Sequence, residues 1–406
     1  MNLAYLTNQY PKISHSFIRR EICALEAQGV AITRFSIRRA REDFPDPADQ
    51  RELTRTEFLL ERGARALSWN TWRIATTRPC AFAKAWRATL KMGWRSQRGL
   101  ARHFIYLAEA CLLRALCVAR GITHLHVHHA TNPATVALLC HTLGGPAYSL
   151  TIHGPEEFEH APRLALNEKI ERAAFVVTVS EWGRRQLLPW CEDTHHERIY
   201  IVRNGVDELF STTMPRAIQN TRRFLWIGRL EEQKDPLLLA RAVRYLRAQK
   251  ISCVVAMLGD GALREILEKE IVRHDLQEMI LIKGWASRAQ ILDELRGARA
   301  LILSSRAENV QSVIVEALLQ TRPVISTDVG GVSEMLQDGE AGWLVPPNSP
   351  EDLARAMRRV LETDVTELER LGLAGRRFVL ENFDATRQAT QLRMLFRGAD
   401  ARAKEN

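Results

Sequence analysis

Short apolar runs alternate with amphipathic helical patterns along most of the chain. In the first half, the runs predict strands at residues 2–6, 30–37, 124–129, 147–152, 174–179 and 198–202. In the second half, they predict strands at residues 223–227, 254–258, 279–283, 300–303 and 324–326. The last two expected helices cover residues 350–361 and 383–397. Strands that alternate with helices predict an α/β protein with parallel sheets.

Three polar segments interrupt this alternation. Residues 38–53 are charged and contain proline, which indicates a surface loop. Residues 330–347 form a turn-rich run. Residues 8–16 form a polar turn in which Ser14 or Ser16 can cap the following helix. This turn has no G-x-G-x-x-G sequence, so the fingerprint of a dinucleotide-binding site is absent. The turn is either a helix start that binds an anion or a plain capped loop.

The strand–helix pattern restarts after Asn204, which indicates a domain joint. A chain of 406 residues favours two domains over one core. We predict an N-terminal domain of residues 1–205 and a C-terminal domain of residues 206–383, with a final helix at residues 384–406 that packs back on the first domain. Each domain is expected to be a Rossmann-like, doubly wound parallel sheet.

Composition indicates the kind of partner and the cellular compartment of the protein. The formal net charge of +9 favours anionic partners. The seven cysteines are scattered without a C-x-x-C pair, so neither a zinc site nor a disulfide framework is indicated. The N-terminal residues lack the pattern of a signal peptide, and no apolar run reaches about 18 residues. These features predict a cytoplasmic protein.

One basic segment stands out within the first predicted domain. Residues 62–102 contain ten Lys and Arg residues, no Asp or Glu, and four tryptophans. Basic helices that also carry Trp, Phe and Leu are typical of proteins that lie on a membrane surface. We therefore expect this segment to hold the protein peripherally on the anionic inner face of the membrane. The alternative is a solvated basic face on ordinary helices, and nucleic acid is not the expected partner.

Histidines gather at two predicted strand ends. The run HLHVHH at residues 124–129 alternates as a strand does, and His129 at its end is a candidate residue of a cleft. No Asp, Glu or Cys lies beside these histidines in the sequence, so no metal site is predicted. His153 follows another strand and precedes Gly154-Pro155, which places it on a turn. It is either a cleft residue or a plain turn histidine.

Two carboxylates bracket the turn after the strand at residues 300–303. Glu308 lies in the turn, and Glu316 lies among apolar residues of a helix predicted at residues 312–320. Ligands of open α/β sheets bind at the carboxyl ends of the strands. Because carboxylates accept hydrogen bonds, two of them at such an edge suit a polyhydroxylated ligand.

Two cations follow the first strand of the second predicted domain. Arg229 comes directly after Gly228, and Lys234 lies five residues further on. Two fixed cations suit a diphosphate, and Gly259 and Gly261 after the next strand let the backbone approach a ligand closely. Cations for a diphosphate and carboxylates for sugar hydroxyls together describe a pocket for a nucleotide-diphosphate sugar.

These segments resemble the retaining glycosyltransferases of family 4, and the resemblance covers nearly the whole chain. The G-R-L-x-x-x-K pattern of that family appears here at residues 228–234, and its Glu-x7-Glu pair appears as Glu308 and Glu316. Its T-x-H-G segment appears at His153. The opening YPKISHSFIRREI and the run HLHVHHA are similar to segments of members that build exopolysaccharides of the colanic-acid type.

The resemblance implies the GT-B fold and the role of each site residue. Arg229 and Lys234 would bind the diphosphate, Glu316 the ribose, and Glu308 the donor sugar. Glu308 and His153 would be catalytic. Further donor contacts are expected from Gly228, Gly259, Gly261, Val310, Ser312 and Val313, and weaker cleft contacts from Ser14, His129 and Asn204.

The implied reaction moves a hexosyl unit from a UDP- or GDP-linked sugar to a glycan or lipid-linked acceptor, with retention of the anomeric configuration. The first domain would bind the acceptor and the second the donor. The product would belong to a cell-surface polysaccharide or a glycolipid. No cofactor is implied, and no metal, because the chain has no D-x-D pattern that matches the metal motif of other glycosyltransferases.

The chain departs from the family pattern next to the first acid. Glu308 is followed by Asn309-Val310-Gln311, where the family usually has Gly-x-Pro. This change alters the loop that would contact the donor sugar. Two alternatives stay open: a sugar-nucleotide epimerase, which shares the two-domain fold, and a non-catalytic scaffold that binds a nucleotide sugar, which the altered loop supports.

Overall fold

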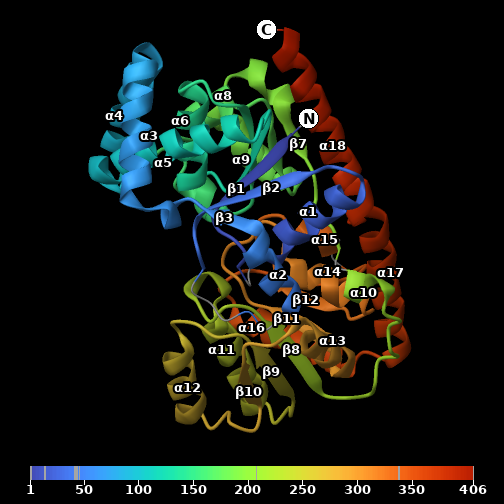
Figure 1. The fold of residues 1–406 in the computed structure, drawn as a ribbon. Helices are drawn as coiled ribbons and strands as arrows, with labels where there is room; N and C mark the ends of the chain where they lie inside the picture. Colours follow the sequence, from blue (N-terminus) through green and yellow to red (C-terminus); the bar gives the residue numbers. More distant parts are fainter. Residues whose placement is uncertain are drawn as a thin grey trace. The chain divides into compact units, whose positions relative to one another are not determined.

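The computed structural model describes residues 2–12, 15–40, 44, 46–206, 208–336 and 339–405. The chain divides into two compact units (Figure 1). The first unit comprises residues 1–205 together with residues 385–406, and the second unit comprises residues 206–384.

The first unit is built on a parallel sheet whose order, over the described residues, is β3-β2-β1-β4-β5-β6-β7. The strands are β1 (Leu3–Gln9), β2 (Ile32–Arg38), β3 (Thr56–Phe58), β4 (His124–His128), β5 (Ala147–Ile152), β6 (Val176–Thr178) and β7 (Ile199–Ile201). From β1 the chain proceeds outward to β3, and from β4 it proceeds outward to β7. This reversal makes the sheet doubly wound, as the sequence predicts, with its topological switch point between β1 and β4.

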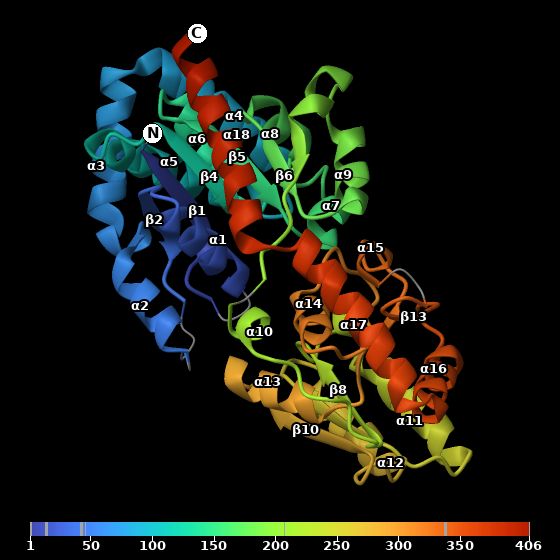
Figure 2. The same ribbon diagram turned by 90° about the vertical axis from the view of Figure 1, so that its right-hand side faces the viewer.

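Helices cover both faces of this sheet. They are α1 (Ser16–Ala27), α2 (Pro47–Arg55), α3 (Gly63–Thr77), α4 (Pro79–Arg95), α5 (Gly99–Ala119), α6 (Asn132–Thr142), α7 (Pro155–Glu159), α8 (Leu166–Arg172), α9 (Glu181–Leu187) and α18 (Ala385–Glu405). The helix α18 lies beside α1 (Figure 2). Apolar residues of α1 and α18 share one buried cluster with Leu3 and Tyr5 of β1. Leu125 and Val127 of β4 belong to a different cluster, with α5 and α6.

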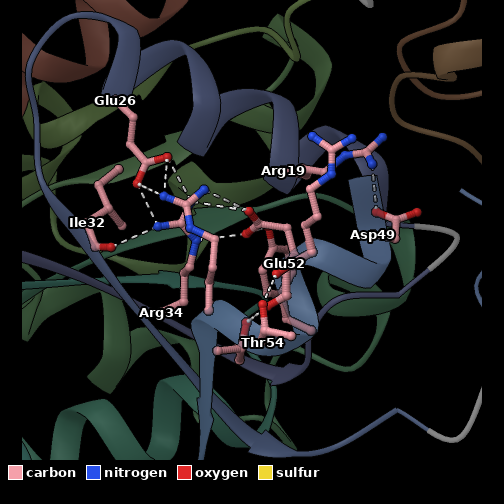
Figure 3. Close-up of polar contacts among 11 residues, drawn as sticks. Arg19, Glu26, Ile32, Arg34, Asp49, Glu52 and Thr54 are labelled. Atoms are coloured by element: carbon pink, nitrogen blue, oxygen red, sulfur yellow. Dashed lines mark hydrogen bonds and ion pairs between the residues drawn. The ribbon is translucent and has the colours of Figure 1, made fainter. Parts of the chain in front are cut away.

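The predicted surface loop at residues 38–53 is wrong over its second half, because residues 47–55 form α2. Two of the charges that suggested a loop, Asp49 and Glu52, are buried ion-pair partners. Arg34 of β2 donates to Glu52 of α2 at 2.7 Å and to Glu26 of α1 at 2.7 Å, and Arg19 lies 3.1 Å from Asp49 (Figure 3). Breaking a buried pair of this kind costs roughly 3–5 kcal/mol, so these contacts hold α2 against α1 and β2.

The basic segment forms α3, α4 and the start of α5. Both α3 and α4 pack against α5 and lie on the side of it away from the sheet (Figure 1). The four tryptophans of this segment are exposed, from Trp86 at 42% to Trp94 at 82%. Lys91 of this segment forms an ion pair, because its ammonium group lies 2.7 Å from the buried carboxylate of Glu168.

The second unit repeats the same plan. Over its described residues the parallel sheet has the order β10-β9-β8-β11-β12-β13. Its strands are β8 (Arg223–Ile227), β9 (Val254–Leu258), β10 (Ile280–Gly284), β11 (Ala300–Leu303), β12 (Val324–Thr327) and β13 (Gly342–Val345). Its helices are α10 (Glu208–Thr212), α11 (Pro236–Ala248), α12 (Arg264–Arg273), α13 (Arg288–Gly297), α14 (Ser312–Leu319), α15 (Ser333–Leu336), α16 (Pro350–Glu362) and α17 (Val365–Asn382). The switch point lies between β8 and β11.

Glycine explains why two of the unpredicted elements of the second unit, β13 and α17, escaped sequence analysis. The strand β13 lies in the expected turn-rich run, and α17 lies just before the helix expected at residues 383–397, which begins at Ala385. A Cβ on Gly342 would lie 2.0 Å from the carbonyl oxygen of Val324, and one on Gly372 of α17 would lie 2.1 Å from that of Thr321. These glycines permit close packing of elements, whereas in a sequence they indicate a break.

Candidate active site

The predicted site residues of the second unit lie at its switch point. β8 pairs with β9 on one side and with β11 on the other. The three strands are parallel, so their carboxyl ends meet at one edge of the sheet. The loops at that edge are residues 228–235, 259–263 and 304–311. This edge carries all of the expected donor-binding residues outside α14.

Backbone contacts between these loops require glycine. The N–H of Gly228 donates to the carbonyl of Leu258 at 3.0 Å. A Cβ on Gly259 would lie 1.8 Å from the carbonyl oxygen of Gly228, and one on Gly330 would lie 1.6 Å from that of Glu308. Both residues also have a positive φ, +137° and +60°, which favours glycine. The loops are therefore packed backbone against backbone at this edge.

The predicted cations and the first acid lie together. The ammonium group of Lys234 donates to the carboxylate of Glu308, which is 5% exposed. Arg229 pairs with Glu231 at 2.8 Å and its side chain is 43% exposed. The loop of Glu308 is held to the loop of Lys234 by the side chain of Gln233, which donates to Ala307 at 3.0 Å. The structure thus brings Lys234 and Glu308 into direct contact, with Arg229 on the same loop as Lys234.

Glu316 lies one turn into α14. The neighbours Ile314, Val315 and Ala317 are buried, whereas Ser312, Val313 and Glu316 are half-buried. Residues three and four apart share a helix face, so these three half-buried residues form one face of α14. Gln311 precedes the helix without a side-chain cap, and the first N–H groups of a helix form a positive end.

In the first unit, the histidines of β4 share one face of the strand. His124, His126 and His128 are fully buried. His126 lies 2.8 Å from the hydroxyl of Ser149 and 2.9 Å from that of Thr151, both on β5. The ring nitrogen Nδ1 of His128 lies 2.8 Å from Nε2 of His153. The switch point of the first unit is thus lined by buried histidines that form hydrogen bonds.

His153 and His129 lie next to one another after their strands, with ring centroids 5.0 Å apart. Glu157 of α7 joins the two loops, because its carboxylate accepts from the backbone N–H groups of Ala130 and of His153. Its carboxylate also lies 3.5 Å from Nδ1 of His129. Burial raises the pKa of Glu157, but the hydrogen bonds from His129 and from these N–H groups outweigh burial and lower it below 4.5. Glu157 therefore stays ionised and fixes the geometry of the two loops.

A carboxylate joins the histidines in space although none does in sequence. Glu21 of α1, His126 and His128 offer three ligand atoms that all lie within 4.8 Å of one another. The absence of an acid beside these histidines therefore holds only for the sequence, because α1 brings Glu21 from more than 100 residues away. Two His and one Glu are a ligand set that zinc accepts.

The remaining predicted residues are less informative. Ser14 lies outside the described residues, and Ser16 begins α1 but does not cap it. His15 occupies the cap position without a side-chain hydrogen bond, and its ring lies 5.2 Å from that of His129. Asn204 is half-buried in the loop after β7.

Sequence reasoning missed Glu21, Glu157 and His15 as members of this cluster. Glu21 and His15 both lie in the YPKISHSFIRREI opening. The resemblance of this segment to other members of the family was recognised, but no role was assigned to either residue. Glu157 had no such signal, because only the fold places its carboxylate under two strand ends.

Two family models match consecutive parts of the chain. The model "Glycosyltransferase Family 4" matches residues 17–208, and the model "Glycosyl transferases group 1" matches residues 215–378. Together they cover most of both units.

Curated relatives match over shorter stretches. An alpha-D-kanosaminyltransferase of Streptomyces kanamyceticus is 31% identical over 138 residues, which are 34% of this chain and 36% of that protein. An amylovoran biosynthesis glycosyltransferase, AmsK, of Erwinia amylovora is 26% identical over 40% of this chain and 42% of its own. The matched stretch thus spans less than half of each of these relatives.

Several solved structures match over nearly the whole chain. The crystal structure of HepE of Anabaena in complex with UDP-glucose superposes with a TM-score of 0.72 and 15% sequence identity, over 98% of this chain and 99% of that one. At this identity the likeness shows the fold, which is the GT-B arrangement of two Rossmann-like units.

Proposed function

The chain belongs to glycosyltransferase family 4, and from this premise we propose that it transfers a hexosyl unit from a nucleotide-diphosphate sugar to a glycan or lipid-linked acceptor. The anomeric configuration would be retained, and the product would belong to a cell-surface polysaccharide or glycolipid. The donor would be linked to UDP or GDP. The UDP-glucose in the HepE complex and the amylovoran named for AmsK support the donor class and the product class.

The observation that carries this proposal is the contact between Lys234 and Glu308 at the switch point of the second unit. A cation that binds a phosphate oxygen and a carboxylate that binds a sugar hydroxyl are there one hydrogen bond apart. In a nucleotide-diphosphate sugar, the outer phosphate and the sugar are joined by one bridging oxygen. A ligand of this kind therefore matches the spacing of the two side chains, which free phosphate or a free sugar would not do.

The chemistry of the second unit is directed at the leaving diphosphate. Negative charge develops on it as the bond to the sugar breaks, and Arg229 and Lys234 would neutralise that charge. The N–H groups at the start of α14, near Val310, Ser312 and Val313, would add to the same positive field. Glu316 on the exposed face of α14 would accept from the ribose hydroxyls, while Glu308 would orient the donor sugar.

The first unit would hold the acceptor, with His153 and His129 at its switch point. Hydroxyl groups of a glycan suit imidazole ring nitrogens as hydrogen-bond partners. Among the described residues, no helix has the length and apolar character that crossing a bilayer requires. The exposed tryptophans and arginines of α3 and α4 would instead hold this unit on an anionic leaflet, where a lipid-linked acceptor is found.

The proposal is tested by transfer from a panel of nucleotide sugars onto a lipid extract, with mass detection of the product. We expect a hexosyl product from one donor, formed equally well in EDTA, because two protein cations supply the charge. A donor converted to its epimer without transfer would identify an epimerase, an alternative that the comparisons above do not favour. Donor binding without any turnover would identify a scaffold protein and would trace the loss to the altered loop after Glu308.

A further inference from the structure

A series of hydrogen-bonded side chains leads from the interior of the first unit to His153. The hydroxyl of Tyr5 donates to Oε1 of Glu21 at 2.6 Å. Nε2 of His128 lies 3.2 Å from the same oxygen, and Nδ1 of His128 lies 2.8 Å from Nε2 of His153. The series crosses β1, α1 and β4 and ends in the loop after β5. Of the four residues in this series, only His153 has a role in the proposed transfer reaction.

The chemistry of each group fixes the direction of the protons. An ionised carboxylate only accepts hydrogen bonds, so Nε2 of His128 carries the proton that faces Glu21. A neutral imidazole has one donor and one acceptor nitrogen, so Nδ1 of His128 accepts from Nε2 of His153. The second nitrogen of His153, Nδ1, then carries a lone pair.

We propose that Glu21 is a positioning residue that acts through His128 to hold His153 in the Nε2–H tautomer, which fixes the orientation of this ring in the loop after β5. The expected effect on turnover rests on the proposed function, which places His153 beside the bound acceptor.

The ring geometry supports the series. The rings of His128 and His153 have centroids 5.1 Å apart and an interplanar angle of 14°, which is compatible with an N–H···N bond in the plane of both rings. The ring of Phe17 lies 4.6 Å from that of His153 and limits its rotation. His128 is fully buried, so its bonds to Glu21 and His153 are protected from competition with water.

Charge also favours this arrangement. Burial, together with the neighbouring rings of His129, His128, His15 and His126, lowers the pKa of His153 well below 6.5. The ring is therefore neutral at physiological pH, and a neutral ring is the form that has two tautomers to choose between. Burial and the charge of Glu21 raise the pKa of Tyr5, so the phenol keeps the proton that it donates.

A metal ion bound by Glu21, His126 and His128 is the competing explanation. The ion would replace the proton on Nε2 of His128. The hydrogen bond from His128 to Glu21 would then no longer fix the tautomer of His153. Nε2 of His126 is 2.9 Å from the hydroxyl of Thr151 but 3.8 Å from Glu21. That nitrogen is therefore directed at the hydroxyl and not at a point shared with the other two ligand atoms, which favours the hydrogen-bonded series.

The tautomer is tested directly by nitrogen-15 NMR of protein labelled at its histidines. Comparison with the variants His128→Gln and His153→Gln assigns the two rings. We expect both rings to carry the proton on Nε2 and the lone pair on Nδ1 at pH 7. A proton on Nδ1 of His153, a charged His153 ring, or one equivalent of zinc in the purified protein by elemental analysis would overturn the proposal. This measurement does not depend on the donor or on turnover.

Kinetics then test the positioning role. Glu21→Gln keeps an oxygen that can accept from His128, whereas Glu21→Ala removes it. We expect kcat to fall about tenfold in Glu21→Ala and by less in Glu21→Gln, with the KM for the donor nearly unchanged in both. His141→Ala, which removes an exposed histidine of α6, is the matched control and should leave kcat unchanged. Equal losses in the two Glu21 variants, tracking their melting temperatures, would show that Glu21 only stabilises the fold.

Discussion

The two switch points of this chain share a topology but differ in their chemistry. In both sheets the chain turns outward from a central pair of strands, β1 and β4 in the first unit and β8 and β11 in the second. The first switch point has buried histidines whose ring nitrogens bond hydroxyls and one another. The second has exposed Arg229 and an ion pair between Lys234 and Glu308.

The difference shows how one fold serves two ligands. An edge lined by histidine rings offers hydrogen-bond partners that suit the hydroxyl groups of a sugar. A charged edge with partial exposure can exchange an internal ion pair for a phosphate at small cost. The comparison therefore predicts that changes of charge at the second edge will act mainly on nucleotide binding. Changes at the first edge will act on turnover and on the acceptor.

The largest expected effect follows from removing the cations. Arg229→Ala and Lys234→Ala should each abolish transfer and weaken nucleotide-diphosphate binding about tenfold or more, since a hydrogen bond to a charged group contributes roughly 1.5–3 kcal/mol. Calorimetry with UDP and GDP measures the affinity. Arg247→Ala, at the far end of α11, is the control, because its side chain is 44% exposed against 43% for Arg229. Unchanged affinity for UDP and GDP in both site variants would show that the diphosphate does not bind at this edge of the sheet.

A smaller effect separates the two acids of the second edge. Glu316→Gln should lose affinity for the nucleoside, because its position on α14 faces the ribose in the proposed site. Glu308→Gln should keep most of the nucleotide affinity and lose turnover, because its partner Lys234 remains while the contact to the donor sugar is weakened. Equal loss of UDP or GDP binding in two folded variants would contradict this division of roles.

Most of the fold could be predicted from the sequence, because apolar runs with a strand period are a local signal. The strands at residues 147–152, 223–227 and 254–258 have the bounds that the pattern predicts. The confirmed doubly wound fold follows from their alternation with helices. The misses have non-local causes: α2 depends on buried ion pairs with Arg34 and Arg19, and β13 and α17 depend on glycines that face other segments.

The site divides in the same way. Residues that match a motif, such as Arg229, Lys234 and Glu308, could be found by their order at strand ends, and the structure brings Lys234 and Glu308 together. Their roles stay predictions. Glu21 could not be linked to His128, because that contact depends on the packing of α1 over β4. The position of Glu21 beside the histidines of β4 can be found only from the folded structure.

A further test concerns the outer face of the first unit. Arg87, Arg95 and Arg98 are exposed on α4 and just after it, close in sequence to Trp94. Changing all three to Gln should reduce flotation with anionic vesicles roughly tenfold, because each basic residue near such a surface contributes at most about 1 kcal/mol. Lys91 is left in place, since it pairs with Glu168.

The control for this test is Arg163, Arg172 and Arg185 changed to Gln, which removes the same charge from exposed positions elsewhere in the unit. Binding of the natural protein should also fall in high salt. Equal flotation of both triple variants, or none of the natural protein, would make the basic segment a solvated face.

The last prediction concerns a buried acid that has no cation in hydrogen-bond contact, and its effect is on stability and not on binding or turnover. Glu109 of α5 is fully buried, and neither of its carboxylate oxygens has a hydrogen-bond partner among the described residues. Burial raises its pKa from 4.5 to about 7, although Arg38 and Arg102 act in the opposite direction. Between these values the folded state binds more protons than the unfolded state, so stability falls as pH rises from about 5 to about 8.

Glu109→Gln removes this titration. Its melting temperature should exceed that of the natural protein by more at pH 8 than at pH 5, with a gain of at most about 3 kcal/mol at the higher pH, since one pKa unit corresponds to about 1.36 kcal/mol. Glu197→Gln, at an exposed position, is the control and should show no such trend. A melting-temperature difference that is the same at both pH values would mean that Glu109 is already paired in solution. The contrast between Glu109 and the ion-paired Glu308 would then disappear.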